Sequence, residues 1–338
     1  MKTRIGINGF GRIGRLVLRT IIENQYNHIE VAAVNSLGNA DSNHHMFKYD
    51  SNYGPFKGPT HSSKNSFTVS GMEIACLTEN HPSVIPWNEY GVEIVLECTG
   101  LYTDRISSSG HFKGGAKKVV ISAPSSDPDI TIVMGVNENN YNPSKHHIVS
   151  NGSCTTNCIA PVIKILDDNF GLEAGLMSTI HSYTNDQNIL DKRHKDLRRA
   201  RSAATNIIPT TTGAAKSIGS VIPHLDGKLH GMAFRIPTPA VSVVDLVATL
   251  GKTVNAEEIN KTYSDASTGH MNGIVGFSAE PLVSSDFKGS SYSCIVDGLS
   301  TLVISESMVK VVAWYDNEWG YSNRIADLTD LIAEKGIV

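Results

Sequence analysis

The fold is decided by residues 4–14, RIGINGFGRIG, in which a short run of strand-forming residues leads into a glycine-rich turn. Glycines at positions 9, 11 and 14 make the pattern G-x-G-x-x-G, and apolar residues then recur at helical spacing from Leu16 to Ile22. In the order strand, turn, helix, this pattern is typical of a loop that holds a dinucleotide pyrophosphate at a helix N-terminus. Residues 29–34, IEVAAV, predict the second strand of a βαβ unit.

The second strand ends without the acidic residue that usually binds the adenosine ribose of NAD. It continues into Asn35 and Ser36, and the first carboxylate is Asp41. A carboxylate at the strand end would repel the 2′-phosphate of NADP, whereas the Ser36 hydroxyl can donate a hydrogen bond to it. The sequence therefore favours NADP. The alternative stays open that NAD binds adequately, either through Asp41 or because the site tolerates the lack of an acid.

Two further apolar runs, at 92–100 and 118–124, predict parallel strands that end in small residues. Ligands of open α/β sheets bind beyond the carboxyl ends of the strands, so Thr99 and Ser122 are candidate neighbours of the cofactor. Residues 60–80 alternate in shorter pieces and predict an antiparallel excursion.

The pattern changes in the second half of the chain. Longer strands are predicted at 175–181, 228–237 and 241–250, with few helices between them, which indicates a mostly antiparallel sheet. The apolar residues of 327–333 fall at helical spacing and predict a last helix.

Composition limits the classes of function. The 338 residues exceed the roughly 100–150 of an average domain, so we expect two domains. A formal net charge of −4 argues against a general nucleic-acid or membrane-surface binder, and no run approaches the roughly 20 apolar residues of a membrane span. The first residues run into a predicted strand and lack the long apolar region of a signal peptide, and five scattered cysteines make no disulfide framework, so we expect a cytoplasmic protein.

The candidate nucleophile lies in residues 150–158, SNGSCTTNC, just before a predicted helix. A thiol at a helix N-terminus lies at the positive end of the macrodipole, so we expect Cys154 to favour its thiolate. The alternative is an inert buried cysteine, a role that fits Cys158 better because apolar residues follow it. The C-x3-C spacing matches no common zinc site, and we expect no metal.

Three other segments carry groups that suit an active site. His181 ends a predicted strand and is a candidate base for Cys154, although 13 histidines make a chance pairing easy. Residues 208–216, IPTTTGAAK, form a hydroxyl-rich turn that could hold an anion. Arg235 lies in an apolar strand, where it meets either an anionic ligand or an internal salt bridge. Arg199 belongs to a basic stretch that is usually a solvated face.

Six ordered motifs resemble phosphorylating glyceraldehyde-3-phosphate dehydrogenases from end to end. They are NGFGRIG at 8–14, SCTTNC at 153–158, HSYTND at 181–186, TTGAAK at 211–216, RIPTP at 235–239 and WYDNEWGY at 314–321. The resemblance implies an α/β Rossmann domain with a doubly wound, mostly parallel sheet over residues 1–150. It also implies an α+β catalytic domain with a mostly antiparallel sheet over 151–316, a C-terminal helix over 317–338 that returns to the first domain, and a homotetramer.

The resemblance also implies the chemistry. Cys154 attacks the aldehyde of glyceraldehyde 3-phosphate, and His181 takes the hydroxyl proton as hydride passes to NAD or NADP. Inorganic phosphate then releases 1,3-bisphosphoglycerate from the thioester.

Each matching position acquires an implied role. The substrate C3 phosphate would be bound by Thr184, Asp186 and Arg235. The attacking inorganic phosphate would be bound by Ser153, Thr155, Arg199, Thr212 and Gly213. The cofactor would be bound by the turn residues Gly9, Phe10, Gly11, Arg12 and Ile13, by Ser36, Thr99 and Ser122, and by Asn317 at the nicotinamide amide.

Two departures from NAD-specific relatives bear on the cofactor. Ser36 stands where those relatives have aspartate, and Lys192-Arg193 stands where they typically have Leu-Pro. In the family this pair lies on a loop that reaches the adenosine end of a neighbouring subunit's cofactor. Two cations there could clamp a 2′-phosphate, so our hypothesis is that the enzyme prefers NADP or accepts both.

Other interpretations remain. An erythrose-4-phosphate dehydrogenase shares the glycine turn and the cysteine motif, but such enzymes generally alter the segment after His181 and the TGAAK cradle, and both are intact here. A non-catalytic nucleotide-binding paralogue would have no need of every chemical position. A cysteine hydrolase would have no use for a dinucleotide fold.

Overall fold

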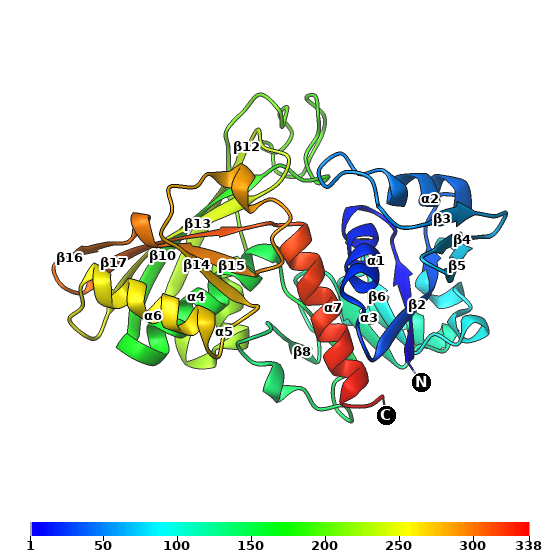
Figure 1. The fold of residues 1–338 in the computed structure, drawn as a ribbon, viewed down its shortest axis with the longest axis horizontal. Coiled ribbons are helices and arrows are strands. Elements are labelled where there is room, and N and C mark those ends of the chain that lie inside the picture. Colours follow the sequence, from blue (N-terminus) through cyan, green and yellow to red (C-terminus); the bar gives the residue numbers. More distant parts are fainter. Residues whose placement is uncertain (1, 338) are drawn as a thin grey trace. The chain divides into compact units, whose positions relative to one another are not determined.

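The computed structural model describes residues 2–337, which divide into two compact units (Figure 1). The first unit comprises residues up to Gly152 together with the segment from Ser322, and the second comprises Ser153–Tyr321. The sequence predicted domain boundaries after residues 150 and 316, and the two units of the structure divide after residues 152 and 321. Over residues 2–337, no helix is both long and apolar enough to span a bilayer.

The first unit is built on one mostly parallel sheet with the strand order β3-β4-β5-β2-β1-β6-β7-β9-β8. The strands are β1 (Thr3–Asn8), β2 (Ile29–Asn35), β3 (Thr60–Ser62), β4 (Ser66–Val69), β5 (Met72–Leu77), β6 (Ile94–Glu97), β7 (Lys118–Ile121), β8 (Ile130–Thr131) and β9 (Ile148–Ser150). Only the pairs β3–β4 and β4–β5 are antiparallel. The mostly parallel sheet expected for this half is confirmed.

Helices and short 3-10 turns connect these strands. They are α1 (Arg12–Asn24), α2 (Ala40–Lys48), η1 (Pro82–Val84), η2 (Trp87–Tyr90), α3 (Arg105–Ser108), η3 (Ser109–Gly114) and η4 (Glu138–Asn140). Strands β2 and β6 flank β1, so the strand order runs outward in both directions from this point. Such a switch point leaves a crevice at the carboxyl ends of the strands, where ligands of doubly wound sheets bind.

The last helix is α7 (Trp319–Glu334), and its residues from Ser322 onward belong to this unit. Its apolar residues Ile325, Leu328 and Ile332, three and four apart, are fully buried. The Tyr26 hydroxyl donates to Asp327 over 2.5 Å, and the backbone N–H of His28 donates to the Asp330 carboxylate over 2.9 Å.

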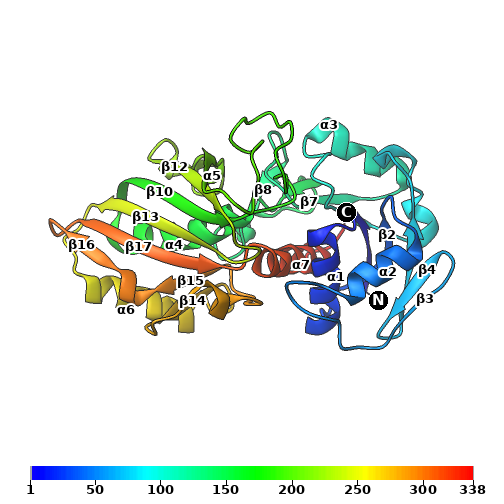
Figure 2. The same cartoon turned by 90° about the horizontal axis from the view of Figure 1, so that it is seen from above.

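The second unit contains a mixed, mostly antiparallel sheet in the order β11-β12-β10-β13-β17-β15-β14, with β16 paired to β17 (Figure 2). The strands are β10 (Leu172–Ser182), β11 (Ile208–Thr211), β12 (Leu229–Ile236), β13 (Ser242–Leu250), β14 (Val275–Ser278), β15 (Cys294–Asp297), β16 (Leu302–Ile304) and β17 (Met308–Tyr315). The expected antiparallel character is confirmed, although β10–β12 and β14–β15 are parallel pairs.

Helices cover one face of this sheet. They are α4 (Cys154–Phe170), α5 (Ala214–Val221) and α6 (Ala256–Thr268), accompanied by η5 (Pro223–Leu225), η6 (Ser284–Phe287) and η7 (Gly298–Ser300). Alternate residues of the strands, such as Val244, Leu246 and Val311, are buried beneath α4. The side chains between them, including Leu176 on β10, Met232 on β12 and Val247 on β13, are exposed on the opposite face.

Candidate active site

The glycine turn after β1 has the shape of a pyrophosphate cradle. Gly9 has φ +94°, and a Cβ there would lie 2.6 Å from the backbone nitrogen of Thr99. A Cβ on Gly14 would lie 2.2 Å from the Gly9 carbonyl oxygen, so turn, helix and strand approach too closely for any side chain. A Cβ on Gly11, the N-cap of α1, would meet nothing within 4 Å. Open space beside free helix N–H groups suits a bound dinucleotide.

The other candidate cofactor residues of this unit lie at carboxyl ends of neighbouring strands. Ser36 follows β2, Thr99 follows β6 and Ser122 follows β7, as the switch point requires. The Ser36 hydroxyl already donates to Asn43 Oδ1 over 2.9 Å. The Arg12 side chain turns away to Asp50, with Nη1 2.6 Å from a carboxylate oxygen, which leaves the backbone of the turn for the cofactor.

A buried polar network lies behind these strand ends, and the sequence did not predict it. Glu97 is buried at the end of β6 and accepts from Asn8 Nδ2 over 2.6 Å and from the Thr99 backbone N–H over 2.8 Å. His111 Nε2 lies 3.1 Å from the same carboxylate, and Trp87 Nε1 donates to His111 Nδ1 over 3.0 Å. Because Nδ1 accepts, His111 donates through Nε2 to Glu97. A glutamate closing an apolar strand was the only signal in the sequence.

In the second unit, Cys154 is the first residue of α4. The Ser153 side chain caps the helix by accepting from the Thr156 backbone N–H over 3.0 Å. The preceding Gly152 has φ +64°, a left-handed conformation that glycine adopts without strain. Cys154 is partly exposed, whereas Cys158, one turn further along, is buried beneath Ala313. The candidate nucleophile thus begins a capped helix.

His181 ends strand β10 and faces the thiol. Its Nε2 lies 3.4 Å from Cys154 Sγ, and its ring meets the Tyr315 ring edge-on with centroids 5.9 Å apart. His181 Nδ1 lies 2.7 Å from the Ser182 carbonyl oxygen and 2.9 Å from Arg235 Nη1. Two sequence candidates and a predicted anion-binding arginine are therefore brought into one cluster.

Burial and the helix N-terminus act in opposite directions on the charge of the Cys154 thiol. Burial raises the pKa of the thiol, and it outweighs the lowering by the Arg235 guanidinium and by hydrogen bonding to Thr155. Burial, followed by Arg235, lowers the pKa of His181 to about 3. Both shifts oppose the charged forms of the two groups, whereas attack on an aldehyde needs the thiolate.

Tyr315 holds the polar side chains around the thiol and was not predicted. Its buried hydroxyl lies 2.9 Å from Thr155 Oγ1 and 2.9 Å from Thr179 Oγ1. Thr155 is the second residue of α4, so this contact ties the first turn of the helix to strands β10 and β17. The tyrosine ends an apolar strand, and nothing in that pattern signals its role.

The candidate anion-binding residues form two groups. Arg235 Nη1 also donates to the Ser182 carbonyl over 3.1 Å and to Thr184 Oγ1 over 3.4 Å. Arg199 pairs instead with Asp186, Nη1 to Oδ2 at 2.5 Å, and its Nε donates to Thr210 Oγ1 over 2.9 Å. The resemblance grouped Asp186 with Arg235, whereas the Asp186 carboxylate here pairs with Arg199, which the resemblance assigned to the other pocket.

The remaining phosphate candidates lie at the start of α5. Thr212 Oγ1 accepts from the Ala214 backbone N–H over 3.2 Å. Gly213 precedes the helix, and a Cβ there would meet nothing within 4 Å. Asn317 lies elsewhere in the unit and is buried, with its Oδ1 accepting from Ser242 Oγ over 3.1 Å.

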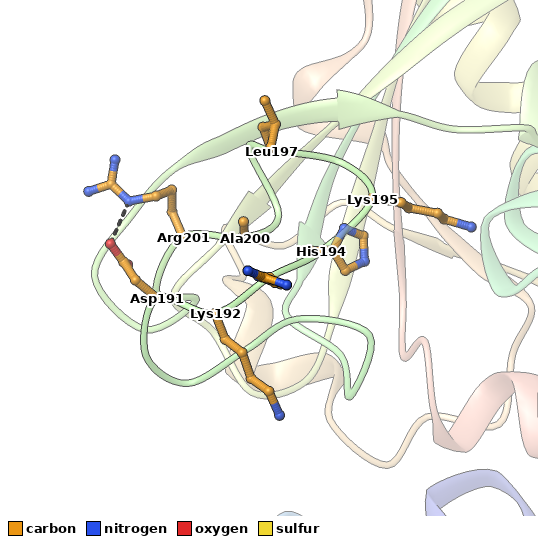
Figure 3. Close-up of a pocket in the computed structure, with 8 residues that line it drawn as sticks. Asp191, Lys192, His194, Lys195, Leu197, Ala200 and Arg201 are labelled. Atoms are coloured by element: carbon orange, nitrogen blue, oxygen red, sulfur yellow. Dashed lines mark hydrogen bonds and ion pairs between the residues drawn. The ribbon is translucent and has the colours of Figure 1, made fainter.

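The loop that carries Lys192 and Arg193 lines an open surface pocket of about 610 Å³ (Figure 3). Its lining is mostly basic and consists of Asp191, Lys192, Arg193, His194, Lys195, Leu197, Ala200 and Arg201. Asp191, the one acid of this lining, pairs with Arg201 at 2.8 Å. Figure 3 shows the Lys192 and Lys195 side chains extending in different directions, so the loop presents spread positive charge.

Among residues 2–337, no cluster of three or more histidine, cysteine, aspartate or glutamate side chains could hold a metal ion.

Comparison with known proteins matches both units to one family. Residues 3–105 match the family model described as glyceraldehyde 3-phosphate dehydrogenase, NAD binding domain, and residues 153–317 match the C-terminal domain of the same family. Glyceraldehyde-3-phosphate dehydrogenase of Geobacillus stearothermophilus is 54% identical over 337 residues, covering 100% of both chains. Glyceraldehyde-3-phosphate dehydrogenase 1 of Bacillus subtilis is 52% identical, again over 100% of both chains. Glyceraldehyde-3-phosphate dehydrogenase 2 of Trichormus variabilis is 49% identical over 99% of both.

Proposed function

The chain belongs to the glyceraldehyde-3-phosphate dehydrogenase family, and on that premise we propose that it oxidises D-glyceraldehyde 3-phosphate to 1,3-bisphosphoglycerate, with inorganic phosphate as the second substrate. The observation that carries the proposal is the 3.4 Å approach of Cys154 Sγ and His181 Nε2 beside Arg235. The first unit is the NAD-binding domain of the family and takes NAD or NADP.

The proposed reaction uses the Cys154 thiol and the His181 imidazole in turn. His181 Nε2 accepts the thiol proton as Cys154 Sγ bonds to the aldehyde carbon and passes it to the carbonyl oxygen, which gives a hemithioacetal and a neutral imidazole. His181 then accepts the proton of the hemithioacetal hydroxyl while the carbon is oxidised, which leaves a thioester on Cys154. The bound dinucleotide supplies the hydride acceptor. Inorganic phosphate attacks the thioester carbon, and the Cys154 sulfur leaves.

The anion-binding groups support this sequence of steps. We assign the substrate C3 phosphate to Arg235 and Thr184, whose side chains share a hydrogen bond beside His181. Asp186 would act on the C3 phosphate pocket indirectly, by holding the Arg199 side chain in place through their ion pair. We assign the attacking phosphate to Ser153, Thr155, Arg199, Thr212 and Gly213. Ser153 caps α4 and Thr155 lies in its first turn, while Thr212 and Gly213 precede α5, and a helix N-terminus favours an anion.

The proposed reaction is tested by its two requirements. Turnover of glyceraldehyde 3-phosphate should depend on inorganic phosphate and should vanish in Cys154→Ser. Phosphate-independent oxidation would favour an erythrose-4-phosphate dehydrogenase instead. Unaltered activity in Cys154→Ser would remove the thiol mechanism, and absence of any turnover in the intact protein would favour a non-catalytic paralogue.

We further propose that the enzyme prefers NADP or accepts both cofactors. The Lys192-Arg193 pair, in a loop of spread positive charge, and the absence of an acid at Ser36 support a 2′-phosphate site. The test compares kcat/KM for NADPH and NADH during reduction of 1,3-bisphosphoglycerate generated in situ. Lys192→Leu with Arg193→Pro should reverse an NADPH preference, whereas Lys288→Leu, an exposed lysine outside the loop, should not. A preference for NADH of about tenfold, or about 1.4 kcal/mol, would contradict this assignment.

We also propose a homotetramer in the cytoplasm. The uncovered face of the second unit's sheet exposes the apolar side chains Leu176, Met232, Val247, Leu302 and Met308, which a second copy could bury. Light scattering should report four chains per particle, and Val247→Lys should reduce that mass. A wild-type particle of one chain would contradict the assembly.

A further inference from the structure

The hydroxyl of Ser36, directly after β2, belongs to a closed set of hydrogen bonds with helix α2. Ser36 Oγ lies 2.9 Å from Asn43 Oδ1, and the Gly38 backbone N–H donates to Ser36 Oγ over 3.2 Å. Asn43 Nδ2 in turn donates to the Gly38 carbonyl oxygen over 3.2 Å. Asn43 therefore contacts both ends of the short turn that carries Ser36.

The Gly38 carbonyl decides which way the Asn43 amide points. A carbonyl oxygen accepts hydrogen bonds and never donates them, so the amide atom that faces it must be Nδ2. Oδ1 then faces Ser36 and can only accept, so the Ser36 hydroxyl must donate its one proton to Asn43. The other acceptor near this hydroxyl is the Gly38 carbonyl at a longer 3.4 Å. In both cases the proton is used inside the turn.

Packing holds this arrangement in place. Asn43 is buried, and a Cβ on Gly38 would lie 3.1 Å from Asn43 Oδ1, so the turn and the helix are in close contact. The Ser36 backbone N–H donates to the Leu77 carbonyl of β5 over 3.0 Å, which fixes the serine on the sheet. Reversing the Asn43 amide would place Oδ1 against the Gly38 oxygen and leave both without a donor, which is costly for buried groups.

Ser36 is left with one lone pair to offer a ligand. A hydroxyl has one proton and two lone pairs, and Asn43 takes the proton while the Gly38 N–H takes one lone pair. Among the residues that the structure describes, no other hydrogen bond reaches Ser36 Oγ, and the residue is partly exposed. The free lone pair can accept from a ribose 2′-hydroxyl, as in NAD. The oxygens of a 2′-phosphate dianion only accept, so they would be repelled by it.

We propose that Asn43 is a positioning residue that sets cofactor specificity: by taking the Ser36 proton, it makes Ser36 an acceptor that favours the 2′-hydroxyl of NAD over the 2′-phosphate of NADP. The inference rests on the proposed function, in which this unit binds NAD or NADP. The end of the second strand is where doubly wound sheets bind the adenosine ribose. The sequence suggested that Ser36 donates to a 2′-phosphate, whereas the fold uses that proton within the protein. A preference for NADP must therefore come from other groups, such as Lys192 and Arg193, and Asn43 opposes it.

The proposal is tested by the binding of NADH and NADPH to the full-length protein, measured by calorimetry without substrate. Asn43→Leu keeps a branched side chain and removes the acceptor, so the Ser36 proton becomes available to a phosphate. The Kd for NADPH should fall about tenfold relative to the Kd for NADH, or by about 1.4 kcal/mol. In the Ser36→Ala background the same change should leave this ratio unaltered, whereas a merely structural effect of Asn43 would persist there.

Ser36→Ala gives a second test that leaves Asn43 in place. If Ser36 acts as an acceptor, this variant should raise the Kd for NADH about fivefold and should not raise the Kd for NADPH. If Ser36 donated to the 2′-phosphate, NADPH would be weakened more than NADH. Ser42→Ala, an exposed serine on α2 beside Asn43, should bind both cofactors as wild type does.

Two results would overturn the proposal. They are an unchanged ratio of the two Kd values in Asn43→Leu, and a Ser36→Ala variant that loses more affinity for NADPH than for NADH. If Asn43→Leu does not fold, as judged by circular dichroism, the Ser36→Ala comparison decides alone. Failure of the proposed function is separate, because it would appear as absent phosphate-dependent turnover of glyceraldehyde 3-phosphate by a wild-type protein that binds the cofactors normally.

Discussion

Replacing Tyr315 by phenylalanine tests the scaffold of the candidate site. The change removes one buried hydroxyl that bridges Thr155 and Thr179 at 2.9 Å each, and it leaves both threonine hydroxyls buried with one partner fewer. A net hydrogen bond contributes about 0.5–1.5 kcal/mol, and two are lost, so we expect unfolding free energy to fall by about 1–3 kcal/mol. Because Thr155 lies in the first turn of α4 and is assigned to the inorganic-phosphate site, KM for inorganic phosphate should rise more than KM for glyceraldehyde 3-phosphate.

The assay is urea unfolding of Tyr315→Phe, Thr179→Val and the double variant, with Tyr49→Phe as a half-exposed control. If the hydroxyl bridge is the cause, the effect of Tyr315→Phe should shrink by about 1 kcal/mol in the Thr179→Val background. Equal effects in both backgrounds, or a loss no larger than in Tyr49→Phe, would refute the reasoning.

Three further predictions follow from other contacts. Burial lowers the pKa of His181 to about 3 from 6.5, so between these pH values the unfolded chain binds a proton that the folded protein does not. The free energy of unfolding should therefore fall by about 1.4 kcal/mol for each pH unit below 6.5 from this group. Unfolding of His181→Asn, measured at pH 6 and pH 4.5, should lack that part of the slope. Asp186→Asn should remove the closer of the two carboxylates that pair with Arg199, leaving Asp196 at 3.7 Å, and should lower KM for inorganic phosphate by up to about fivefold; an unchanged or raised KM would count against Arg199 as a phosphate ligand. Glu97→Gln should cost about 1.5–3 kcal/mol of unfolding free energy because the buried carboxylate accepts from Asn8 and Thr99, and a shift within 0.5 kcal/mol would show that the network adds no stability.

Local patterns predicted the fold because each one records a steric or solvation requirement. A Cβ at position 9 or 14 would lie 2.6 or 2.2 Å from neighbouring backbone atoms, so only glycine fits at these two positions, and their spacing is visible in the sequence. The antiparallel character of the second sheet followed from strand length and alternation. The parallel pairing of β10 with β12 was not predictable, because their order in the sheet is fixed by long-range packing.

The site was predicted in part. The motif residues Cys154 and His181 stood out by their polar company, but their 3.4 Å approach joins a helix start to a strand end and has no local signature. The roles of Tyr315 and Glu97 were not predicted, because each residue ends an apolar strand, and an isolated polar residue at that position usually indicates only the end of the strand. The helix position that predicted a thiolate at Cys154 is visible in the sequence, whereas the burial that opposes the anion depends on the folded surroundings.

The most direct test of the central claim is a rapid-mixing experiment without inorganic phosphate. Protein mixed with glyceraldehyde 3-phosphate and NADP or NAD should produce one equivalent of reduced cofactor per active site and then stop. Mass spectrometry should then find the acyl group on Cys154, and adding phosphate should restart turnover. Continuous turnover without phosphate, or an acyl group on any other residue, would contradict the proposed thioester mechanism.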